Sequence, residues 1–443
     1  NFFPIDSLFI PSLSPGIVYA RTEDGMGVPK AMRPSPGASN QTASLLLESP
    51  AFSMESGFYT APFTVQIQVP EDLSVYYTLD GSEPTPDDYL YTEPLTFSDP
   101  SPNSNVFSVR EDITSQMSAY ASPDTPVDKA LILRAAAYDE SGNYSQTITA
   151  SYFLDFEKKT GLENISVLSL VTDPANLFDD HSGIYIRGSR YEQGVANAEI
   201  SPDLSWSKLT DYLNYYLRGT ISERPAHLTL MDSSHSLLLE EECGIRIRGN
   251  ESRSFPQKSF TLFARKRYGS DTFAPVFFDT GFSYPDLILN SSKELKKVFF
   301  FSLVEDRSAA VQRYTPCQVF LNGEYWGMYY LMEKYSAEYL ENHYGIEKEN
   351  SLLIKTAWEV QEGDPDDVSQ FQYLQNYLDL DMSDPGLYED LQELMDMQSF
   401  IDWMCTNIYI ANTDSKPLGG NVFTWRASLP GWKEYEDGKW RWM

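Results

Sequence analysis

The chain has 443 residues, of which 42% are hydrophobic and 14% aromatic, so it is long and apolar enough for two or three folded domains and is not predominantly disordered. Its 64 acidic residues outnumber its 33 basic residues and give a formal net charge of −31. This balance argues against general binding to nucleic acid or to an anionic membrane, because both require a basic surface. No apolar run reaches the length of about eighteen residues that a membrane-spanning helix needs.

Residues 1–46 are expected to form an irregular lead-in or linker, because prolines recur there with Gly and Ser between them and the hydrophobic pattern has little periodicity. The first residue is Asn1 rather than Met. This is compatible with a signal peptide or anchor that has been removed, or with a fragment of a longer chain.

Residues 47–155 are expected to form a small β-sandwich. Short segments with alternating apolar and polar residues follow one another between polar turns, of which Asp80-Gly81 is a favoured hairpin turn. The strand-like segments are residues 63–69, 75–79, 132–138 and 147–153. No catalytic arrangement is visible in this region.

Residues 156–443 mix strand and helix patterns and predict an α+β domain. The expected strands are residues 165–171, 183–188, 226–231, 237–239, 244–248, 259–263, 286–290, 318–321, 324–332 and 422–425, with a loop over 188–208. Helices are expected within 293–313, from Glu333 to His343, and over 384–408, where Asp384 and Pro385 suit a helix start.

A segment rich in Arg and Lys connects two of these strands. Ile245 and Ile247 alternate with basic residues, Gly249-Asn250 supplies a turn, and Lys258 opens the second strand. The cations of this short span are Arg246, Arg248, Arg253, Lys258, Arg265, Lys266 and Arg267. A strand–turn–strand of this kind can hold phosphate oxygens through backbone N–H groups, guanidinium groups and an ammonium group. The alternative is an ordinary hairpin with a solvated cationic edge.

A second candidate site is the loop from Asn412 to Asn421, which follows the last long helix. Asp414 is followed by six residues and then by Asn421. In phosphoryl transfer, a carboxylate accepts the proton of the substrate hydroxyl and a nearby oxygen ligand binds Mg²⁺. By itself such a loop can equally be a plain turn. The chain order of phosphate-holding strands, helix, strand pair and Asp/Asn loop nevertheless parallels that of a kinase.

Two resemblances to known families follow from longer strings. The string YYTLDGSEPT, which ends at Thr85, with Gly57-Phe-Tyr59 and residues 135–145, resembles the chitobiase/β-hexosaminidase C-terminal-like domain. This resemblance implies an immunoglobulin-like sandwich that serves as a spacer or contacts sugars weakly.

The strings GIRIRGNESRSFPQKSF, VFLNGEYWGMYYLMEKY, YLENHYGI, LLIK and FIDWMCTNIYIANTD resemble the CotH family of spore-coat-type atypical protein kinases over residues 160–443. This resemblance implies a bacterial cell-surface or extracellular protein that uses ATP with Mg or Mn and phosphorylates Ser or Thr of other proteins. It implies catalysis by Asp414, metal binding by Asn421 and Asp414, and phosphate binding by Lys258. Arg248 and Asn250 would belong to the nucleotide-facing loop, and Glu333 would have a structural role.

The resemblance also raises an expectation about the C-terminus. The family continues past the string GKWRW into a Trp-Asp-x-Asp motif whose aspartate binds metal, whereas this sequence ends at Met443. The kinase-like domain is therefore expected to be truncated and to lack one metal ligand.

Other candidate sites have weaker patterns. The four histidines share no metal-binding spacing, and Cys243, Cys317 and Cys405 fit buried thiols better than disulfides or a zinc site. The acidic loop with Glu362, Asp364, Asp366 and Asp367 is expected to be a solvated loop, with loose Ca²⁺ binding as the alternative.

The sequence thus predicts a β-sandwich followed by an α+β, kinase-like domain that phosphorylates proteins at the cell surface or spore coat. The alternative is a non-catalytic surface scaffold, adhesion or carbohydrate-binding protein that retains a kinase-like fold.

Overall fold

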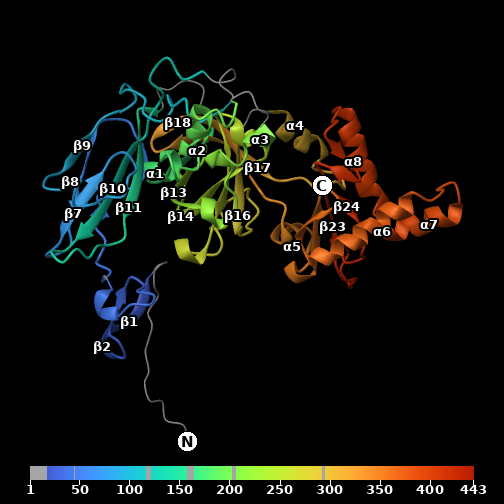
Figure 1. Ribbon diagram of the computed structural model, residues 1–443, viewed down its shortest axis with the longest axis horizontal. Coiled ribbons are helices and arrows are strands. Elements are labelled where there is room, and N and C mark those ends of the chain that lie inside the picture. Colours follow the sequence, from blue (N-terminus) through green and yellow to red (C-terminus); the bar gives the residue numbers. More distant parts are fainter. Residues whose placement is uncertain (1–16, 44, 116–120, 157–163, 202–205, 292–294) are drawn as a thin grey trace, which may run out of the picture. The chain divides into compact units, whose positions relative to one another are not determined.

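A computed structural model describes the chain except for residues 1–16, 44, 116–120, 157–163, 202–205 and 292–294 (Figure 1). The described chain divides into two compact units. The first holds Asn1–Val276, Ile288–Ser291 and Thr315–Leu331, and the second holds Phe277–Leu287, Ser292–Tyr314 and Met332–Met443. Each unit is described by itself.

The stretch that was expected to be irregular contains an antiparallel hairpin, formed by β1 (Val18–Glu23) and β2 (Met26–Met32). Asp24 and Gly25 form its two-residue turn, and Gly25 has a φ value of 75°, which glycine adopts without steric cost. Both strands are largely solvent-accessible. The sequence pattern missed this hairpin because little apolar alternation marks a strand that buries so few side chains.

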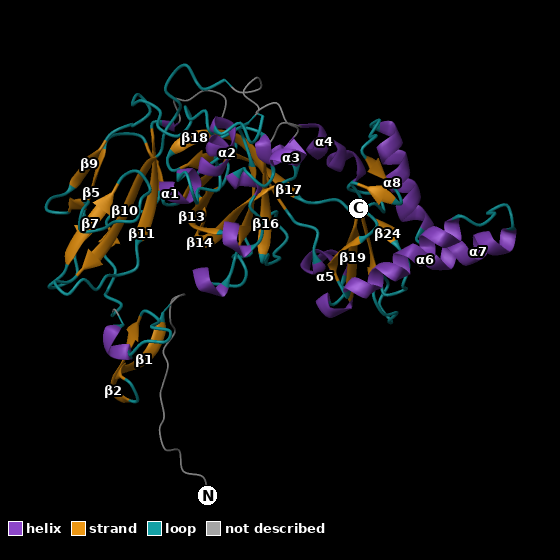
Figure 2. Ribbon diagram, in the orientation of Figure 1, coloured by secondary structure: helices purple, strands orange, loops and turns teal. Residues whose placement is uncertain are grey.

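The predicted β-sandwich region is confirmed as sheet-rich. Its main sheet has the order β4-β11-β10-β7-β8, and two small strand pairs, β3-β6 and β5-β9, accompany it (Figure 2). The bounds are β3 (Ala51–Phe52), β4 (Gly57–Tyr59), β5 (Phe63–Val65), β6 (Ile67–Gln68), β7 (Ser74–Thr78), β8 (Tyr89–Leu90), β9 (Leu95–Phe97), β10 (Leu131–Tyr138) and β11 (Ile148–Leu154). Buried side chains such as Leu133, Val65 and Tyr152 form its apolar core.

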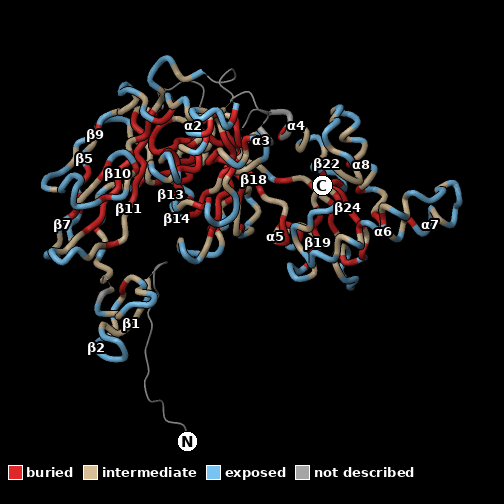
Figure 3. Tube along the Cα trace, in the orientation of Figure 1, coloured by how far each residue is buried: buried red, intermediate tan, exposed pale blue. Residues whose placement is uncertain are grey.

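A closed seven-stranded barrel follows, in the order β12-β13-β14-β15-β16-β18-β17. Its strands are β12 (Ser166–Val171), β13 (Arg224–Met231), β14 (Leu237–Arg248), β15 (Ser259–Phe263), β16 (Asp286–Ser291), β17 (Tyr314–Leu321) and β18 (Glu324–Met332). The two separately predicted strands at 237–239 and 244–248 are one strand, β14. Buried residues lie along the barrel strands (Figure 3), so side-chain packing fixes the register of each strand.

One predicted strand of this region is wrong. Residues 183–188 form no strand, although Ile184, Tyr185 and Ile186 are buried as a strand would require. The N–H groups of Ile184 and Tyr185 donate instead to the carbonyl oxygens of Asn176 and Leu177, at and beside α1 (Pro174–Phe178). An apolar run alone cannot reveal this choice of partner.

The predicted loop over 188–208 is also wrong, because it contains α2 (Ser189–Ala196) and α3 (Trp206–Leu209). α2 is polar on most of its surface, so its sequence reads as a loop. Tyr191 is buried against a local cluster with Ile200, Leu209 and Leu213, and this packing favours the helix. Short 3₁₀ turns lie around these helices, namely Asn214–Tyr216, Thr220–Ser222, Glu251–Ser254 and Lys266–Tyr268.

The second unit combines a four-stranded sheet with helices. Its sheet order is β20-β19-β23-β24, with β19 (Ser351–Lys355), β20 (Glu359–Glu362), β23 (Phe423–Ala427) and β24 (Arg441–Trp442). The helices are α4 (Leu295–Val304), α5 (Ala337–Tyr344), α6 (Val368–Leu378), α7 (Pro385–Leu394) and α8 (Met397–Tyr409). The architecture confirms the predicted α+β class. None of the helices in the described part of the chain is long and apolar enough to cross a membrane.

The single helix predicted over 384–408 is two helices, α7 and α8, interrupted at Met395 and Asp396. Asp396 Oδ1 accepts a hydrogen bond from Ser399 N at 3.0 Å and caps α8, while Asp396 N donates to Trp440 O at 2.9 Å. An N-cap carboxylate and a contact with a distant strand together outweigh the continuous apolar periodicity. The break matters for function because it sets the direction of α8, which leads directly into the Asp414 loop.

Candidate active site

Lys258, the predicted phosphate-binding lysine, is fully buried in the first unit. Its Nζ donates hydrogen bonds to the carbonyl oxygens of Ile113 at 2.6 Å, Arg253 at 2.6 Å and Phe255 at 2.7 Å. Since an ammonium group has three N–H donors, these carbonyls can engage all of them. The predicted role in phosphate binding stays a prediction, and phosphate contact would require Nζ to leave at least one of these acceptors.

Aromatic rings complete the surroundings of this ammonium group. Nζ lies 4.0 Å from the ring centroid of Tyr215 and 5.1 Å from that of Tyr185, which are cation–π distances. Tyr185 also positions the backbone of Lys258, because its hydroxyl accepts from Lys258 N at 2.9 Å and donates to Pro256 O at 2.9 Å. The rings stabilise the cation without supplying a full negative charge.

A second cation, Arg253, lies buried close to Lys258. Its guanidinium group donates to the carbonyl oxygens of Gly249 at 2.6 Å, Tyr215 at 2.9 Å and Leu217 at 3.2 Å. Burial lowers the pKa of Arg253 to about 10. Burial also lowers the pKa of Lys258 well below its ordinary value, and the nearby Arg253 lowers it further. The two cations are thus held mainly by neutral backbone oxygens.

The predicted nucleotide-facing residues Arg248 and Asn250 lie at the turn that joins β14 to the 3₁₀ turn Glu251–Ser254. Gly249 has a φ of 114° and a Cβ there would lie 2.1 Å from Ser252 Oγ, so only glycine fits. Asn250 is exposed, and its Oδ1 accepts a hydrogen bond from Arg218 Nη2 at 2.9 Å. Arg218 therefore adds a cation at this turn that the sequence pattern did not identify.

Other arginines of the cationic segment point to an internal carboxylate. The buried side chain of Glu223 contacts the guanidinium groups of Arg246, Arg265 and Arg267, at 3.4 Å for Arg246 and 2.9 Å for Arg265. Burial alone would raise the pKa of Glu223, but hydrogen bonds from Arg265 and Arg267 outweigh it, and the pKa lies below its ordinary value. Arg265 and Arg267 remain partly solvated while they pair with Glu223, so the plain alternative of a solvated cationic edge holds in part for these two residues.

The second predicted element, the Asp414–Asn421 loop, is a tight hairpin in the second unit. Its strands are β21 (Ser415–Lys416) and β22 (Gly419–Gly420), which pair across Pro417 and Leu418. The hairpin brings the ends of the loop together, so that Asn421 Nδ2 donates to Asp414 Oδ2 at 2.5 Å. Both residues are exposed. Folding thus places the two side chains side by side, as a shared proton-accepting and metal-binding site requires.

Three hydrogen bonds hold the hairpin in position. Asn412 Oδ1 accepts from Asp414 N at 3.1 Å, and Ser415 Oγ donates to Asn421 O at 2.7 Å. Trp442 Nε1, from the buried strand β24, donates to Pro417 O at 2.9 Å. β24 is antiparallel to β23, and Met443 N donates to Phe423 O at 3.0 Å.

The chemistry of this pair suits a hard cation. Carboxylate and amide oxygens are the ligands that Mg²⁺ takes, and Mg²⁺ commonly binds one or two protein oxygens and keeps several waters. With Asn421 Nδ2 directed at Asp414, the amide Oδ1 is left facing elsewhere as an acceptor. Among the described residues, no group of three His, Cys, Asp or Glu side chains is placed to hold a metal ion.

The structure brings Asp414 and Asn421 together, and it brings Lys258 together with Arg253 near the turn of Arg248 and Asn250. Lys258 belongs to the first unit and Asp414 to the second. The two halves of the predicted active site therefore belong to different units.

Glu333, for which the sequence suggested a structural role, is a buried centre of hydrogen bonds in the second unit. Its carboxylate accepts from Tyr284 Oη at 2.9 Å and from Arg313 N at 2.8 Å, and it contacts His343 Nε2 at 2.8 Å. These bonds join the end of β18 to α5 and to the segment before β16. The structural interpretation agrees with this geometry.

The acidic loop has a structural explanation. Asp364 Oδ1 accepts from Asp366 N, and Asp367 Oδ2 accepts from Asp364 N, in a capping box that starts the 3₁₀ turn Pro365–Asp367 before α6. Of the three cysteines, Cys243 and Cys317 are buried as predicted, and burial raises the pKa of both thiols. The prediction of a buried thiol is wrong for Cys405, which is exposed on α8.

Several residues of the first unit's cluster carry no sequence signal of their own. Tyr185, Tyr215 and Glu223 lie far from Lys258 in sequence, in segments whose local pattern resembles any buried strand or loop. A single carboxylate next to a cationic segment is too common to be singled out, and only the closed barrel brings it there.

Comparison with known families supports the assignment of these parts. Residues 245–443 match the family model described as CotH kinase protein. This CotH-like part contains Lys258, Asp414 and Asn421. Residues 54–119 match the model of the chitobiase/beta-hexosaminidase C-terminal domain, so both resemblances and their order along the chain are confirmed. No curated protein shows a significant match to the chain.

Proposed function

We propose that the CotH-like part is an extracytoplasmic atypical protein kinase, which transfers the γ-phosphate of ATP to Ser or Thr of surface or coat proteins. The observation that carries this proposal is the contact between Asp414 and Asn421, which places a carboxylate and an amide side by side at the ends of one hairpin. The family match indicates a kinase-like protein and a coat or surface association. The chitobiase-like sandwich would act as a spacer that contacts glycans weakly.

In this proposal Asp414 accepts the proton of the substrate hydroxyl through its carboxylate, and Asn421 both orients Asp414 and offers its Oδ1 to a metal ion. A bound Mg²⁺ or Mn²⁺ would neutralise the phosphate oxygens. Lys258, with Arg248 and Asn250 at the neighbouring turn, would meet the nucleotide phosphates.

A second candidate function is a non-catalytic surface scaffold that keeps the fold. The observation that favours it is the full engagement of the Lys258 ammonium group by three backbone carbonyls, which leaves no N–H donor for phosphate in this conformation.

Thermal unfolding with ATP and either Mg²⁺ or Mn²⁺ separates these candidates, because a ligand that binds the native state raises the midpoint by mass action. We expect a rise at millimolar nucleotide that needs the metal, together with γ-phosphate transfer to Ser/Thr peptides. Asp414→Asn should remove transfer, while Asp366→Asn, an exposed acid of the same unit, should retain it. No midpoint shift and no transfer would favour the scaffold. A chain extended at its C-terminus tests, in the same assays, whether a further metal-binding aspartate follows Met443.

A further inference from the structure

The connection between β9 and β10 leaves the sandwich and runs onto the barrel within the first unit. We call residues 98–115 of this connection the strap. Its last residues, Ile113 and Thr114, are 2% and 0% exposed, although they belong to a loop of an accessory module. Burial of a loop to this degree indicates specific partners, since its backbone polar groups must be satisfied there.

The buried end of the strap contacts the loop that holds Lys258. Ile113 O accepts from Lys258 Nζ at 2.6 Å, and Thr114 Oγ1 donates to Ser254 O at 2.5 Å. Arg187, next to α2, donates from its backbone N to Asp112 O at 2.8 Å and from Nη1 to Thr114 O at 3.2 Å. The strap thus supplies one of the three acceptors of the predicted phosphate-binding lysine.

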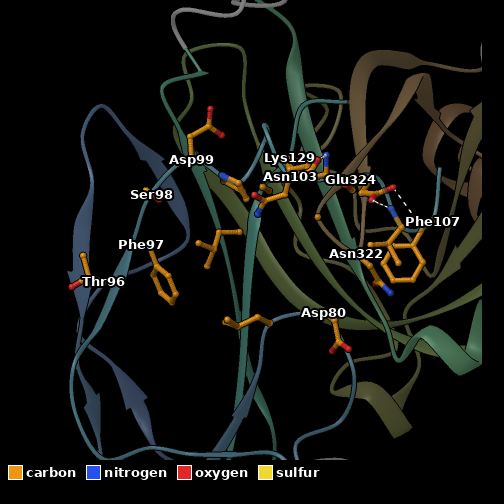
Figure 4. A pocket seen from close by; sticks show the side chains of 17 residues that line it. Asp80, Thr96, Phe97, Ser98, Asp99, Asn103, Phe107, Lys129, Asn322 and Glu324 are labelled. Carbon is orange, nitrogen blue, oxygen red and sulfur yellow. Dashed lines mark hydrogen bonds between the residues drawn. The ribbon is translucent and has the colours of Figure 1, made fainter. Parts of the chain in front are cut away.

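A second contact fastens the middle of the strap to the start of β18. The carboxylate of Glu324 is buried and accepts from the backbone N–H groups of Val106 at 2.5 Å, Phe107 at 3.1 Å and Ser108 at 2.8 Å. Figure 4 shows Glu324 beside Phe107. Phe107 also stacks on Phe178 of α1 with ring centroids 5.1 Å apart. Charge-assisted bonds to one buried carboxylate hold the middle of the strap firmly on the start of β18.

The exposed part of the strap lies between residues 98 and 109 and borders a cavity. A cavity of about 410 Å³ lies beside it and is lined by strap residues, among them Asn103 and Val106, and by Asn322 of the β17–β18 turn (Figure 4). Val106 and Val109 are 63% and 39% exposed. Lys129 ties this part of the strap down, because its Nζ donates to Ser101 O at 3.4 Å, to Asn103 O at 2.9 Å and to Asn105 Oδ1 at 2.9 Å.

The charge around Lys258 determines what would follow if the strap moved away from its ammonium group. In the part of the chain that the structure describes, no carboxylate forms an ion pair with its ammonium group, and burial beside Arg253 disfavours the charged form. An anionic phosphate oxygen would form a charge-assisted bond stronger than the one to a neutral carbonyl. Withdrawal of Ile113 O would free one N–H donor and leave the other two in place.

We propose that the strap is an autoinhibitory element, which occupies one N–H donor of Lys258 through Ile113 O and must lift its Ile113–Thr114 end before a phosphate group can bind there. This inference rests on the proposed kinase function for the identity of the ligand, but the occlusion of Lys258 by the strap can be measured without it.

The test uses the full chain and pyridoxal 5′-phosphate, a phosphate-bearing aldehyde whose imine with lysine is trapped by borohydride and mapped by peptide mass. Thr114→Val/Glu324→Gln weakens both fastenings of the strap. Ser56→Ala is the matched control, because it removes a different sandwich-to-barrel hydrogen bond, from Ser56 Oγ to Glu240 Oε1 at 2.5 Å. Lys334, which pairs with Asp286 in the second unit, is the internal reference lysine.

We expect slow labelling of Lys258 in the unmodified chain and in Ser56→Ala, and roughly tenfold faster labelling in the double variant, as for an opening equilibrium shifted by the loss of hydrogen bonds. Labelling of Lys258 that does not change, or that rises only in step with Lys334, would overturn the strap proposal. If labelling rises and ATP with Mg²⁺ protects Lys258, both proposals hold. If labelling rises without protection by ATP, the strap remains and the nucleotide role of Lys258 fails.

Discussion

The two halves of the candidate active site differ in the burial of their charged and polar groups. In the first unit, Lys258 and Arg253 are buried, and their donors are engaged by backbone carbonyls. In the second unit, Asp414 and Asn421 are exposed and bond to each other at the ends of a hairpin. Buried cations that hold loops together contribute to folding, whereas an exposed polar pair costs little to change and is free to serve a ligand. Substitutions should therefore separate the two halves by their effect on stability.

The largest expected effect concerns the exposed pair. Asp414→Asn should lower kcat for phosphotransfer about 10²–10⁴-fold, the usual contribution of a positioned general base, because an amide cannot accept the substrate proton. The free energy of unfolding should change by less than about 0.5 kcal/mol, as for an exposed site. Single-turnover kinetics and chemical denaturation on the same preparation check both values. A large loss of stability would break the proposed contrast.

Removal of a buried charge in the first unit should lower stability, in contrast to the substitution at Asp414. Glu223→Leu removes the buried carboxylate that Arg246, Arg265 and Arg267 share. Since two of the arginines are partly solvated, we expect a loss of about 2–3 kcal/mol, below the range for a fully buried pair. Urea unfolding measures the loss. Arg267→Lys, which keeps one charge at the partly exposed position, is the milder control, and equal stability of all three chains would contradict this prediction.

The first unit should also show a pH-dependent stability from His227. Burial alone lowers the pKa of this imidazole, but hydrogen bonds to Glu240 and Glu242 outweigh it and raise the pKa to about 9. Because the folded pKa lies above the ordinary value of 6.5, the stabilisation is fully present below about pH 6.5 and is lost as the pH rises through about 9.

His227→Gln should therefore destabilise the chain by about 1–2 kcal/mol at pH 6 and by much less at pH 9.5, a range that allows for the solvent exposure of both glutamates. Denaturation of both chains across this range gives the difference directly. A gap that is constant with pH would show that His227 contributes by packing alone.

The smallest expected effect concerns Asp364, an exposed acid of the same unit as Asp414. Asp364→Ala removes the N-cap of the turn before α6 and should cost about 1 kcal/mol. Phosphotransfer should stay unchanged, and Ca²⁺ should not alter the thermal midpoint of either chain. A Ca²⁺-dependent midpoint that disappears in the variant would restore the metal-binding interpretation of this loop.

The sequence-based predictions succeed where neighbouring residues decide an element, and they fail where contacts with distant residues decide it. The turn at Gly249-Asn250, the second half of β14, the strand β15 and the start of α7 at Asp384 have clear patterns in neighbouring residues, and all were predicted. The false strand at 183–188 and the missed helix α2 depend on contacts with α1 and with the cluster around Tyr191. Periodicity reports only which side of an element is buried, so it cannot name the partner that buries it.

The sequence by itself determined the order of the two modules, the α+β class, and the Asp414, Asn421 and Lys258 candidates, because motifs and local turn chemistry are written in neighbouring residues. Only the tertiary structure decided that the hairpin places Asp414 against Asn421, that Glu223 collects three arginines, and that Ile113 reaches Lys258. These contacts join residues that are between 7 and 145 positions apart. Their formation depends on how a closed barrel and a paired hairpin bring distant backbone together, and no local pattern encodes that geometry.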